Sequence, residues 1–328
     1  MKTQIRTVKQ VAELIKTGKT LLIAGDEKLL KQLPKGSWIA GTIPYLMDYS
    51  GGIFTESELF ITELPGYVLS TKQVVYDDDS ISSVYSDAYT NGFSVIIMPS
   101  GSDIHSSFSL NSGKYHGFAN KPLVGWVSGI NLDKAEYSTP KVFDGKTGNS
   151  FTDQAVVLHA CLPSNKIAYV DIINIFEEGT GDELTFPVDG FLTRDVLVNG
   201  RRKNFAEYLE VNKISLKQPL VTDSFGTMLN TSFKKIENNK VYFYAPVYAN
   251  TVYKIAKPIE DYVYEFFKQI PVGISKKVVF SCNCILNYLY AELEGRPTFS
   301  FAGPITFGEI AYKLLNQTMV YLSVDEVV

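Results

Sequence analysis

The chain has 328 residues, of which 45% are hydrophobic, with 31 lysines and arginines against 35 aspartates and glutamates. This composition excludes a disordered, collagen-like or coiled-coil protein and suggests two ordinary domains or one large domain. The formal net charge of −4 argues against a general nucleic-acid-binding protein, because such proteins usually carry a basic excess. With three cysteines and three histidines, most metal or acid–base chemistry would have to use those residues or carboxylates.

The N-terminus shows no targeting signal. The first 20 residues lack the apolar core of a secretory signal, and no stretch approaches the ~18 apolar residues that a membrane span needs. Three cysteines cannot form a complete set of disulfides. We therefore expect a soluble, cytoplasmic protein that does not act in a membrane.

The N-terminal part of the chain alternates between helical and strand patterns. Apolar residues at helical spacing predict a helix over residues 7–17, which Gly18 would end. Asp26 is a candidate N-cap for a second helix that would stop before Pro34. We also expect a helix over residues 80–89 and a polar loop over residues 133–153. The predicted strands are residues 21–24, 38–43, 59–64, 93–98 and 123–127.

The pattern after residue 154 is richer in strands. Residues 155–161 and 167–176 flank Pro163-Ser164-Asn165, which predicts a hairpin. Residues 233–236 and 241–244 predict a second hairpin. Further expected strands are residues 193–198, 278–281, 298–302 and 318–323, and the expected helices are residues 204–211, 258–270 and 283–293.

Familiar nucleotide and hydrolase signatures are incomplete. Two Gly-Lys-Thr tripeptides each lack the earlier glycine of a phosphate-binding loop, because Glu13 and Pro140 occupy those positions. The chain contains neither a dinucleotide-binding glycine fingerprint nor a nucleophile elbow. These absences favour a binding function over an enzymatic one.

The cysteines leave three interpretations open. Cys282 and Cys284 follow an apolar strand, where small buried residues are common. A structural metal would also need His159 and Cys161, which share one face of their strand. A thiol at the start of a helix can have a lowered pKa, so Cys282 could instead be a nucleophile with His159 as its base.

A haem group is a further alternative, because it needs one axial side chain and an apolar pocket. His105, His116 and His159 are the imidazole candidates. His105 and His116 flank a segment rich in serine and glycine, which we expect to be a loop.

Three segments near the C-terminus form a recognisable set. They are a strand ending in Cys282, the block Phe-Ala-Gly-Pro-Ile-Thr-Phe-Gly-Glu-Ile over residues 301–310, and Leu-Asn-Gln-Thr-Met-Val over residues 315–320. Together they resemble the C-terminal half of FIST-domain proteins, an intracellular signal-transduction family. Upstream, the turn at residues 198–200 resembles the junction between the two halves of that family. The resemblance implies a FIST N-terminal-like domain over residues 1–197 and a FIST C-terminal-like domain over residues 198–328.

The resemblance also implies a function. It suggests an α/β fold of mixed sheets with flanking helices, and a sensory protein that binds a small-molecule ligand, with amino-acid-like molecules among the candidates. A signalling protein would be its partner, and no resident cofactor is expected, although some bacterial relatives are haem-based nitric-oxide sensors. The alternatives that stay open are an enzyme using Cys282 as nucleophile and a haem-based gas sensor.

The candidate ligand-binding residues lie in the same three segments. A glycine permits close approach of a backbone to a ligand, and the carboxylate that follows it in the Gly-Glu-Ile sequence could bind an ammonium group. The residues that we select are Cys282, Asn283, Gly303, Phe307 and Glu309.

Overall fold

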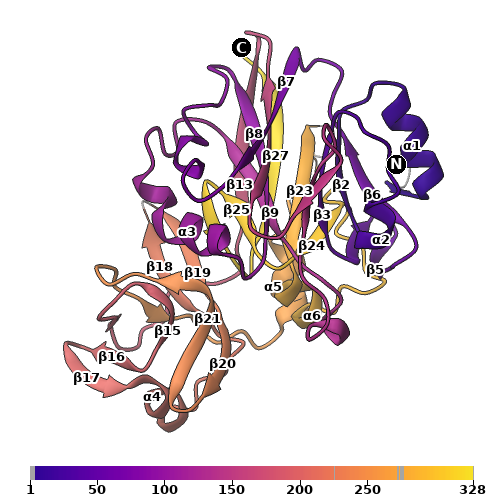
Figure 1. Ribbon diagram of the computed structural model, residues 1–328. Coiled ribbons are helices and arrows are strands. Elements are labelled where there is room, and N and C mark those ends of the chain that lie inside the picture. The colour runs from indigo at the N-terminus through magenta and orange to yellow at the C-terminus, as the bar shows by residue number, and fades with distance from the viewer. Residues whose placement is uncertain (1–3, 225, 272, 274–276, 328) are drawn as a thin grey trace. The chain divides into compact units, whose positions relative to one another are not determined.

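The structure is a computed structural model that describes residues 4–224, 226–271, 273 and 277–327. The chain forms two compact units, which we call the first and the second unit. The first comprises residues 1–173, 270–314 and 319–328, and the second comprises residues 174–269 and 315–318. These limits do not coincide with the predicted join between residues 197 and 198. Figure 1 labels the elements of both units.

The first sheet of the first unit carries the N-terminal helix. In spatial order its strands are β1 (Ile5–Arg6), β6 (Leu59–Glu63), β2 (Leu21–Gly25), β3 (Trp38–Thr42), β10 (Val142–Asp144) and β11 (Asn149–Phe151). Helix α1 (Val8–Lys16) begins at Thr7, whose hydroxyl accepts a hydrogen bond from the backbone N–H of Gln10. Val11 and Ile15 on α1 are buried in one cluster with apolar residues of β2, β3 and β6, so the predicted helical face is the one that packs.

The second sheet holds the most deeply buried strands. In spatial order they are β26 (Lys313–Leu315), β25 (Glu309–Ala311), β9 (Leu123–Ser128), β8 (Gly92–Pro99), β12 (Ala155–Cys161) and β7 (Ser70–Tyr76). Every residue of β8 and β9 is buried, which is typical of strands covered on both faces.

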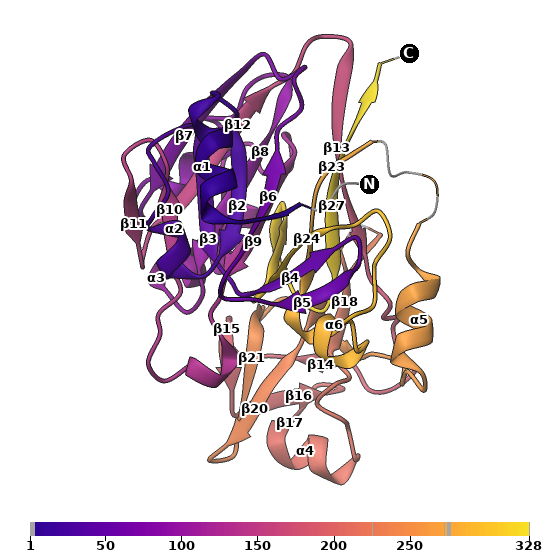
Figure 2. The ribbon, with the colours of Figure 1, turned by 90° about the vertical axis from the view of Figure 1, so that its right-hand side faces the viewer.

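Half of the strands of the third sheet come from the C-terminal part of the chain (Figure 2). In spatial order its strands are β13 (Lys166–Ile173), β27 (Met319–Glu326), β23 (Val278–Cys284), β24 (Gly303–Thr306), β4 (Tyr45–Asp48) and β5 (Gly51–Phe54).

Each sheet of the first unit contains a parallel strand pair joined by a short helix. The helices are α2 (Glu27–Leu30) between β2 and β3, α3 (Asp103–Asn111) between β8 and β9, and α6 (Ile285–Tyr290) between β23 and β24. All other strand pairs in these sheets that the structure describes are antiparallel. The predicted α/β class with mixed sheets is therefore confirmed.

The described residues of the second unit form three small antiparallel sheets and two helices. The sheets are β14 (Leu184–Thr185), β16 (Asp195–Val198) and β17 (Arg201–Asn204); β15 (Gly190–Thr193), β21 (Lys240–Val247) and β20 (Phe233–Glu237); and β19 (Thr227–Thr231), β18 (Leu220–Ser224) and β22 (Lys254–Ile255). The helices are α4 (Phe205–Val211) and α5 (Tyr262–Lys268). Five aromatic side chains pack together in its core: Phe186, Phe205, Phe233, Phe243 and Tyr253. Part of the large aromatic content is thus structural.

Several local predictions are confirmed and one hairpin is wrong. β20 and β21 form the predicted hairpin, and β16 and β17 pair across Asn199-Gly200. The predicted hairpin around Pro163 does not form, because β12 pairs with β7 and β8 while β13 pairs with β27. The turn sequence there redirects the chain into another sheet, since a turn signal alone does not specify which strand will be the partner.

Three further segments differ from expectation. Residues 80–89 contain only a 3₁₀ turn over Ile81–Ser83, because Asp77 and Ser80 bond each other's backbone and offer the chain an alternative to a helix. The expected loop around His105 is helix α3, and its Ser102 N-cap explains why a serine-rich stretch can begin a helix. Residues 298–302 form a turn rather than a strand, and the strand begins at residue 303.

No helix among the described residues combines the length and the apolar character needed to cross a lipid bilayer.

Candidate functional site

A pocket lies at the carboxyl ends of the parallel strands β2 and β3, next to the residues that follow β9. Its volume is about 390 Å³, which is enough for a small metabolite. Thr42 ends β3, Gly129 follows β9, and the backbone N–H of Gly129 donates to the carbonyl of Thr42 at 2.7 Å. Ligands of open α/β sheets bind outside the carboxyl ends of parallel strands, so this position is a natural binding site.

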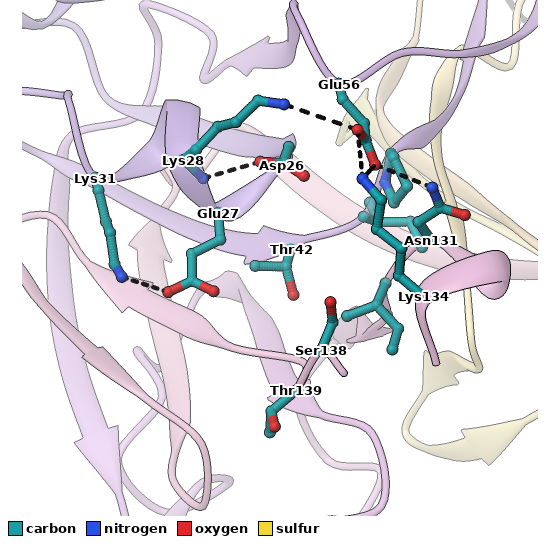
Figure 3. A pocket seen from close by; sticks show the side chains of 14 residues that line it. Asp26, Glu27, Lys28, Lys31, Thr42, Glu56, Asn131, Lys134, Ser138 and Thr139 are labelled. Carbon is teal, nitrogen blue, oxygen red and sulfur yellow. Dashed lines mark hydrogen bonds and ion pairs between the residues drawn. The ribbon is translucent and has the colours of Figure 1, made fainter. Parts of the chain in front are cut away.

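Glu27 forms the first charged corner of the pocket (Figure 3). Its carboxylate lies 2.5 Å from the Nζ atom of Lys31 and 2.5 Å from that of Lys141. Burial raises the pKa of Glu27, but the hydrogen bonds and positive charges of Lys141 and Lys31 outweigh burial and hold the pKa below its usual value. Glu27 is therefore ionised and fully engaged with two lysines.

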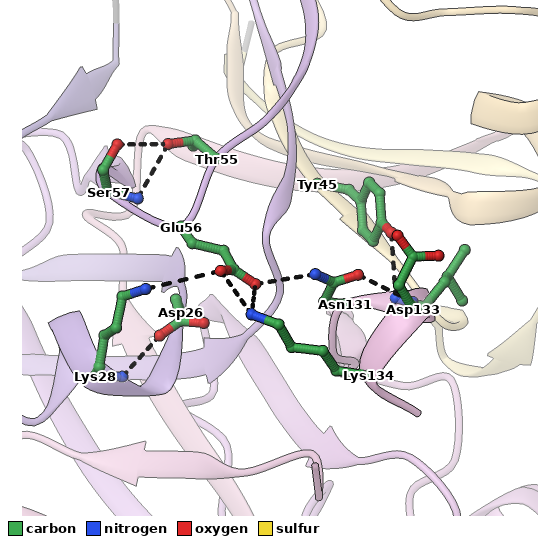
Figure 4. Close-up of polar contacts among 10 residues, drawn as sticks. Asp26, Lys28, Tyr45, Thr55, Glu56, Ser57, Asn131, Asp133 and Lys134 are labelled. Atoms are coloured by element: carbon green, nitrogen blue, oxygen red, sulfur yellow. Dashed lines mark hydrogen bonds and ion pairs between the residues drawn. The ribbon is translucent and has the colours of Figure 1, made fainter. Parts of the chain in front are cut away.

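Glu56 forms the second charged corner (Figure 4). Its two carboxylate oxygens lie 2.7 and 2.8 Å from the Nζ atom of Lys134, and the side-chain amide of Asn131 donates to it at 3.0 Å. Lys28 is a third, longer contact at 3.7 Å. The hydrogen bond from Lys134 lowers the pKa of Glu56 and, reciprocally, raises the pKa of Lys134.

Tyr45 also holds the segment that follows β9. Its hydroxyl accepts a hydrogen bond from the backbone N–H of Leu132 at 3.2 Å, while its ring packs against Phe54 and Tyr288 at centroid distances of 5.2 and 5.8 Å. Glu56 and Tyr45 thus hold residues 131–134 in place along the pocket wall.

Four polar groups in the pocket keep bonding capacity. Asp26 accepts a hydrogen bond from the backbone N–H of Lys28 through Oδ1, and no other bond to its carboxylate is present in the described chain. Thr42 is buried and accepts from the backbone N–H of Lys141 at 2.9 Å, which leaves its hydroxyl proton available. The hydroxyls of Ser138 and Thr139 also line the cavity (Figure 3) and have no bond to any described residue. The pocket therefore offers one anionic acceptor and three hydroxyl donors.

The structure places most of the sequence-predicted site residues elsewhere. Cys282, Asn283 and Glu309 are buried in the interior of the first unit and are not among the residues that line the pocket. The thiol of Cys282 donates to the carbonyl of Gly125 at 3.3 Å, and Glu309 accepts from the hydroxyl of Thr306 at 3.1 Å. Burial, with the charge of Glu309 adding to it, raises the pKa of Cys282 well above its usual value.

Gly303 allows β24 to pack close to β23. A Cβ atom at this position would lie 1.8 Å from the carbonyl oxygen of Ser281, so only glycine allows β24 to approach β23 here.

Phe307 lies next to one residue of the pocket wall, although it does not line the cavity itself. A Cβ atom at Gly129 would lie 2.5 Å from the ring of Phe307, and Gly129 itself lines the cavity. The backbone N–H of Phe307 also donates to the carbonyl of Val127 at 3.1 Å. Of the five predicted residues, Phe307 is the one that touches a pocket residue in these contacts.

His159 is engaged away from Cys282. Its Nδ1 atom lies 2.7 Å from the hydroxyl of Ser94, and its Nε2 atom lies 3.1 Å from the hydroxyl of Tyr76. The expected pairing of His159 with Cys282 is not present. Within the described ranges, no three His, Cys, Asp or Glu side chains gather in a way that could hold a metal ion.

Glu27, Glu56 and Lys134 were not among the residues that the sequence predicted for the site. Asp26 was predicted only as a helix cap, and the segment that contains Lys134 only as a loop. A useful signal was present, because charged and polar residues directly follow the strands that end near Gly25 and Ser128. Polar residues at that place in parallel strands are the usual ligand contacts of α/β proteins.

Comparison with known proteins assigns a family. The chain belongs to a family of unknown function (DUF6976), whose model matches residues 6–325. No curated protein and no solved structure matches the chain.

Proposed function

We propose that this protein binds a small amino-acid-like zwitterion in the pocket of the first unit and acts as a binding or sensory protein. The observation that carries this proposal is the pairing of a carboxylate and hydroxyl donors in one cavity. Asp26 forms no ion pair with a lysine of the described chain, although Lys134 lies close enough to interact with its charge, and Thr42 has a buried hydroxyl whose proton is available.

The two groups suit the two ends of an amino acid. An ammonium group would bind the carboxylate of Asp26, because a charge-assisted hydrogen bond is about twice as strong as a neutral one. A carboxylate would accept from the hydroxyls of Thr42, Ser138 and Thr139. Thr42 and Ser138 turn toward the same part of the cavity (Figure 3).

The paired charges of the pocket favour a zwitterion over a simple anion. Glu27 and Glu56 already neutralise much of the charge of the surrounding lysines, so a strongly anionic ligand would have to displace these carboxylates. A zwitterion has no net charge and leaves both ion pairs intact. The resemblance to FIST domains suggests the same class of ligand, and the cytoplasmic location and the signalling partner belong to the same proposal.

A catalytic role for Cys282 finds less support. A nucleophilic thiol needs a lowered pKa and a nearby base, whereas burial raises the pKa of Cys282 and His159 bonds Ser94 and Tyr76.

A thermal-shift screen tests the proposal. Each amino acid is compared with its decarboxylated amine and its N-acetyl derivative. A bound ligand at about 100 times its Kd adds about 2.7 kcal/mol to the free energy of unfolding, so the Tm should rise for an intact zwitterion and much less for either derivative.

The matched variants are Asp26→Asn and Asp133→Asn. Asparagine caps helices as well as aspartate does, so Asp26→Asn keeps the start of α2 and removes only the charge. Asp133 is exposed, lies nearby and does not line the pocket. The site is supported if the thermal shift caused by the amino acid disappears in Asp26→Asn and remains in Asp133→Asn. It is contradicted if both variants keep the shift, or if the decarboxylated amine raises the Tm as much as the amino acid does.

A further inference from the structure

Strand β13 presents an unpaired edge of unusual length. It forms the border of the third sheet and pairs with β27 along all eight residues. Among the described residues of the first unit, none hydrogen-bonds to the other side of its backbone from Ile167 to Ile173. Half of the N–H and C=O groups of such a strand point outward and are available to another strand.

The other sheet borders of the first unit are protected in ways that β13 is not. β1, β11, β26 and β5 have only two to four residues, and short borders are one device by which proteins prevent edge-to-edge association. β7 has seven residues, but none of its side chains is a large exposed apolar group. On β13, Ile167 and Tyr169 are 38% and 47% exposed.

The exposed side chains of β13 share one face. Ile167, Tyr169 and Asp171 alternate with Ala168, which is buried, and with Val170, which is half-buried. The strand therefore offers main-chain hydrogen-bonding groups along its edge and an apolar pair on its solvent face. Addition of a strand to a sheet uses these same two features.

We propose that β13 pairs with β13 of a second copy of this chain, in an antiparallel arrangement around a two-fold axis at Ala168. In this register Ile167 of each copy lies opposite Tyr169 of the other, which makes two pairings of a β-branched with an aromatic side chain. Such cross-strand pairs stabilise antiparallel sheets. A two-fold axis also makes both copies use the same surface, as in most homodimers.

The polar residues favour the same register. Asp171 of each copy lies opposite Asn165 of the other, in the turn directly before β13, so that an amide can donate to each carboxylate and the two negative charges stay apart, beyond the two ends of the paired residues. An axis at Tyr169 would instead place Ile167 opposite Asp171. An axis at Ile167 would place Tyr169 opposite Asn165. On the face that carries Ile167, Tyr169 and Asp171, the register at Ala168 matches apolar with apolar and charged with polar residues, while on the other face Lys166 lies opposite Val170.

Sedimentation equilibrium of the full chain between about 1 and 100 µM tests the proposal, since the population of a dimer depends on concentration. The variants are Ile167→Lys and Tyr169→Lys, which replace exposed side chains and leave the core intact. Tyr137→Lys is the control, because Tyr137 is 86% exposed and lies outside β13. Circular dichroism verifies that each variant is folded.

The expected result is a wild-type dimer whose dissociation constant rises at least about tenfold in both β13 variants and stays unchanged in Tyr137→Lys. Hydrogen exchange should also slow at the outward-facing amides of residues 166–170, which pair with each other in this register, as the concentration rises. A wild-type chain that remains monomeric at about 100 µM overturns the proposal, and the edge of β13 would then have to pair with a chain other than a second copy. A dimer that neither β13 variant weakens overturns it as well.

Discussion

Protonation of His159 should destabilise the fold, and a single substitution isolates the effect. The ring is fully buried on β12, between the hydroxyls of Ser94 and Tyr76. The charged groups near it are Lys72, which lies opposite His159 on β7, and Asp87, which accepts a hydrogen bond from Tyr76 at 2.8 Å. A positive charge on the ring would be both desolvated and close to the lysine.

The magnitude follows from the pKa. Burial, aided by the charge of Lys72 and opposed by that of Asp87, lowers the pKa of His159 from 6.5 to about 4. In the unfolded chain the ring titrates near its usual value, so the unfolded state binds the proton first. The contribution to stability is therefore complete above about pH 6.5 and is lost as the pH falls toward about 4. Since a difference of one in pKa between the folded and unfolded states corresponds to about 1.4 kcal/mol, the loss amounts to about 3 kcal/mol.

Urea unfolding of the wild type and of His159→Gln, followed by circular dichroism from about pH 8 to about pH 4.5, measures this loss. The free energy of unfolding of the wild type should fall relative to that of the variant by about 2 to 3 kcal/mol over this range. Glu27 and Glu56, whose pKa values are lowered, also lose stabilising interactions in acid, but they do so in both proteins and cancel in the difference. His116→Gln is the control, because His116 is exposed and its loss should leave the wild-type curve unchanged. Parallel curves for the wild type and His159→Gln would refute the reasoning.

Three further predictions concern packing and reactivity. Gly129→Ala should lower the free energy of unfolding by about 1–3 kcal/mol, because its Cβ atom would meet the ring of Phe307 at 2.5 Å; a neutral result in thermal unfolding would contradict this contact. Iodoacetamide should label Cys161 well before Cys282, because burial raises the pKa of Cys282; mass spectrometry of time points would expose equal rates as a contradiction. Asn316→Ala should cost about 1–3 kcal/mol in urea unfolding, because it leaves a buried backbone N–H of the second unit without its acceptor; a cost below about 0.5 kcal/mol would contradict it.

Local elements were predictable where all the residues that determine them lie close together in the sequence. The residues that cap α1 and those that form its apolar face lie within ten positions of one another. Asn199 and Gly200 adopt positive φ angles of 47° and 80°, which is the conformation that a tight hairpin demands and that these two residue types tolerate. Such features depend on neighbours in the chain and on little else.

Strand partners and the pocket were not predictable in this way. β12 and β13 are separated by four residues yet belong to different sheets, because the choice depends on which distant strands bury each face. Glu56 and Lys134 are 78 positions apart, and an ion pair at that separation follows no spacing rule. The site becomes visible only when the ends of β2, β3 and β9 are brought together by the fold.

The segment selected by its resemblance nevertheless lies against the pocket. The backbone N–H of Gly129 donates to the carbonyl of Thr42, which lines the cavity, and a Cβ atom at Gly129 would meet the ring of Phe307. Two residues after Phe307, Glu309 enters β25, which pairs with β9. A ligand that contacts Thr42 would therefore act on the same backbone that Phe307 supports. If the ligand proposed above binds in this pocket, Phe307→Ala should weaken its binding by loosening Gly129, even though the ring does not line the cavity, and the thermal shift caused by the ligand should be smaller than in the wild type.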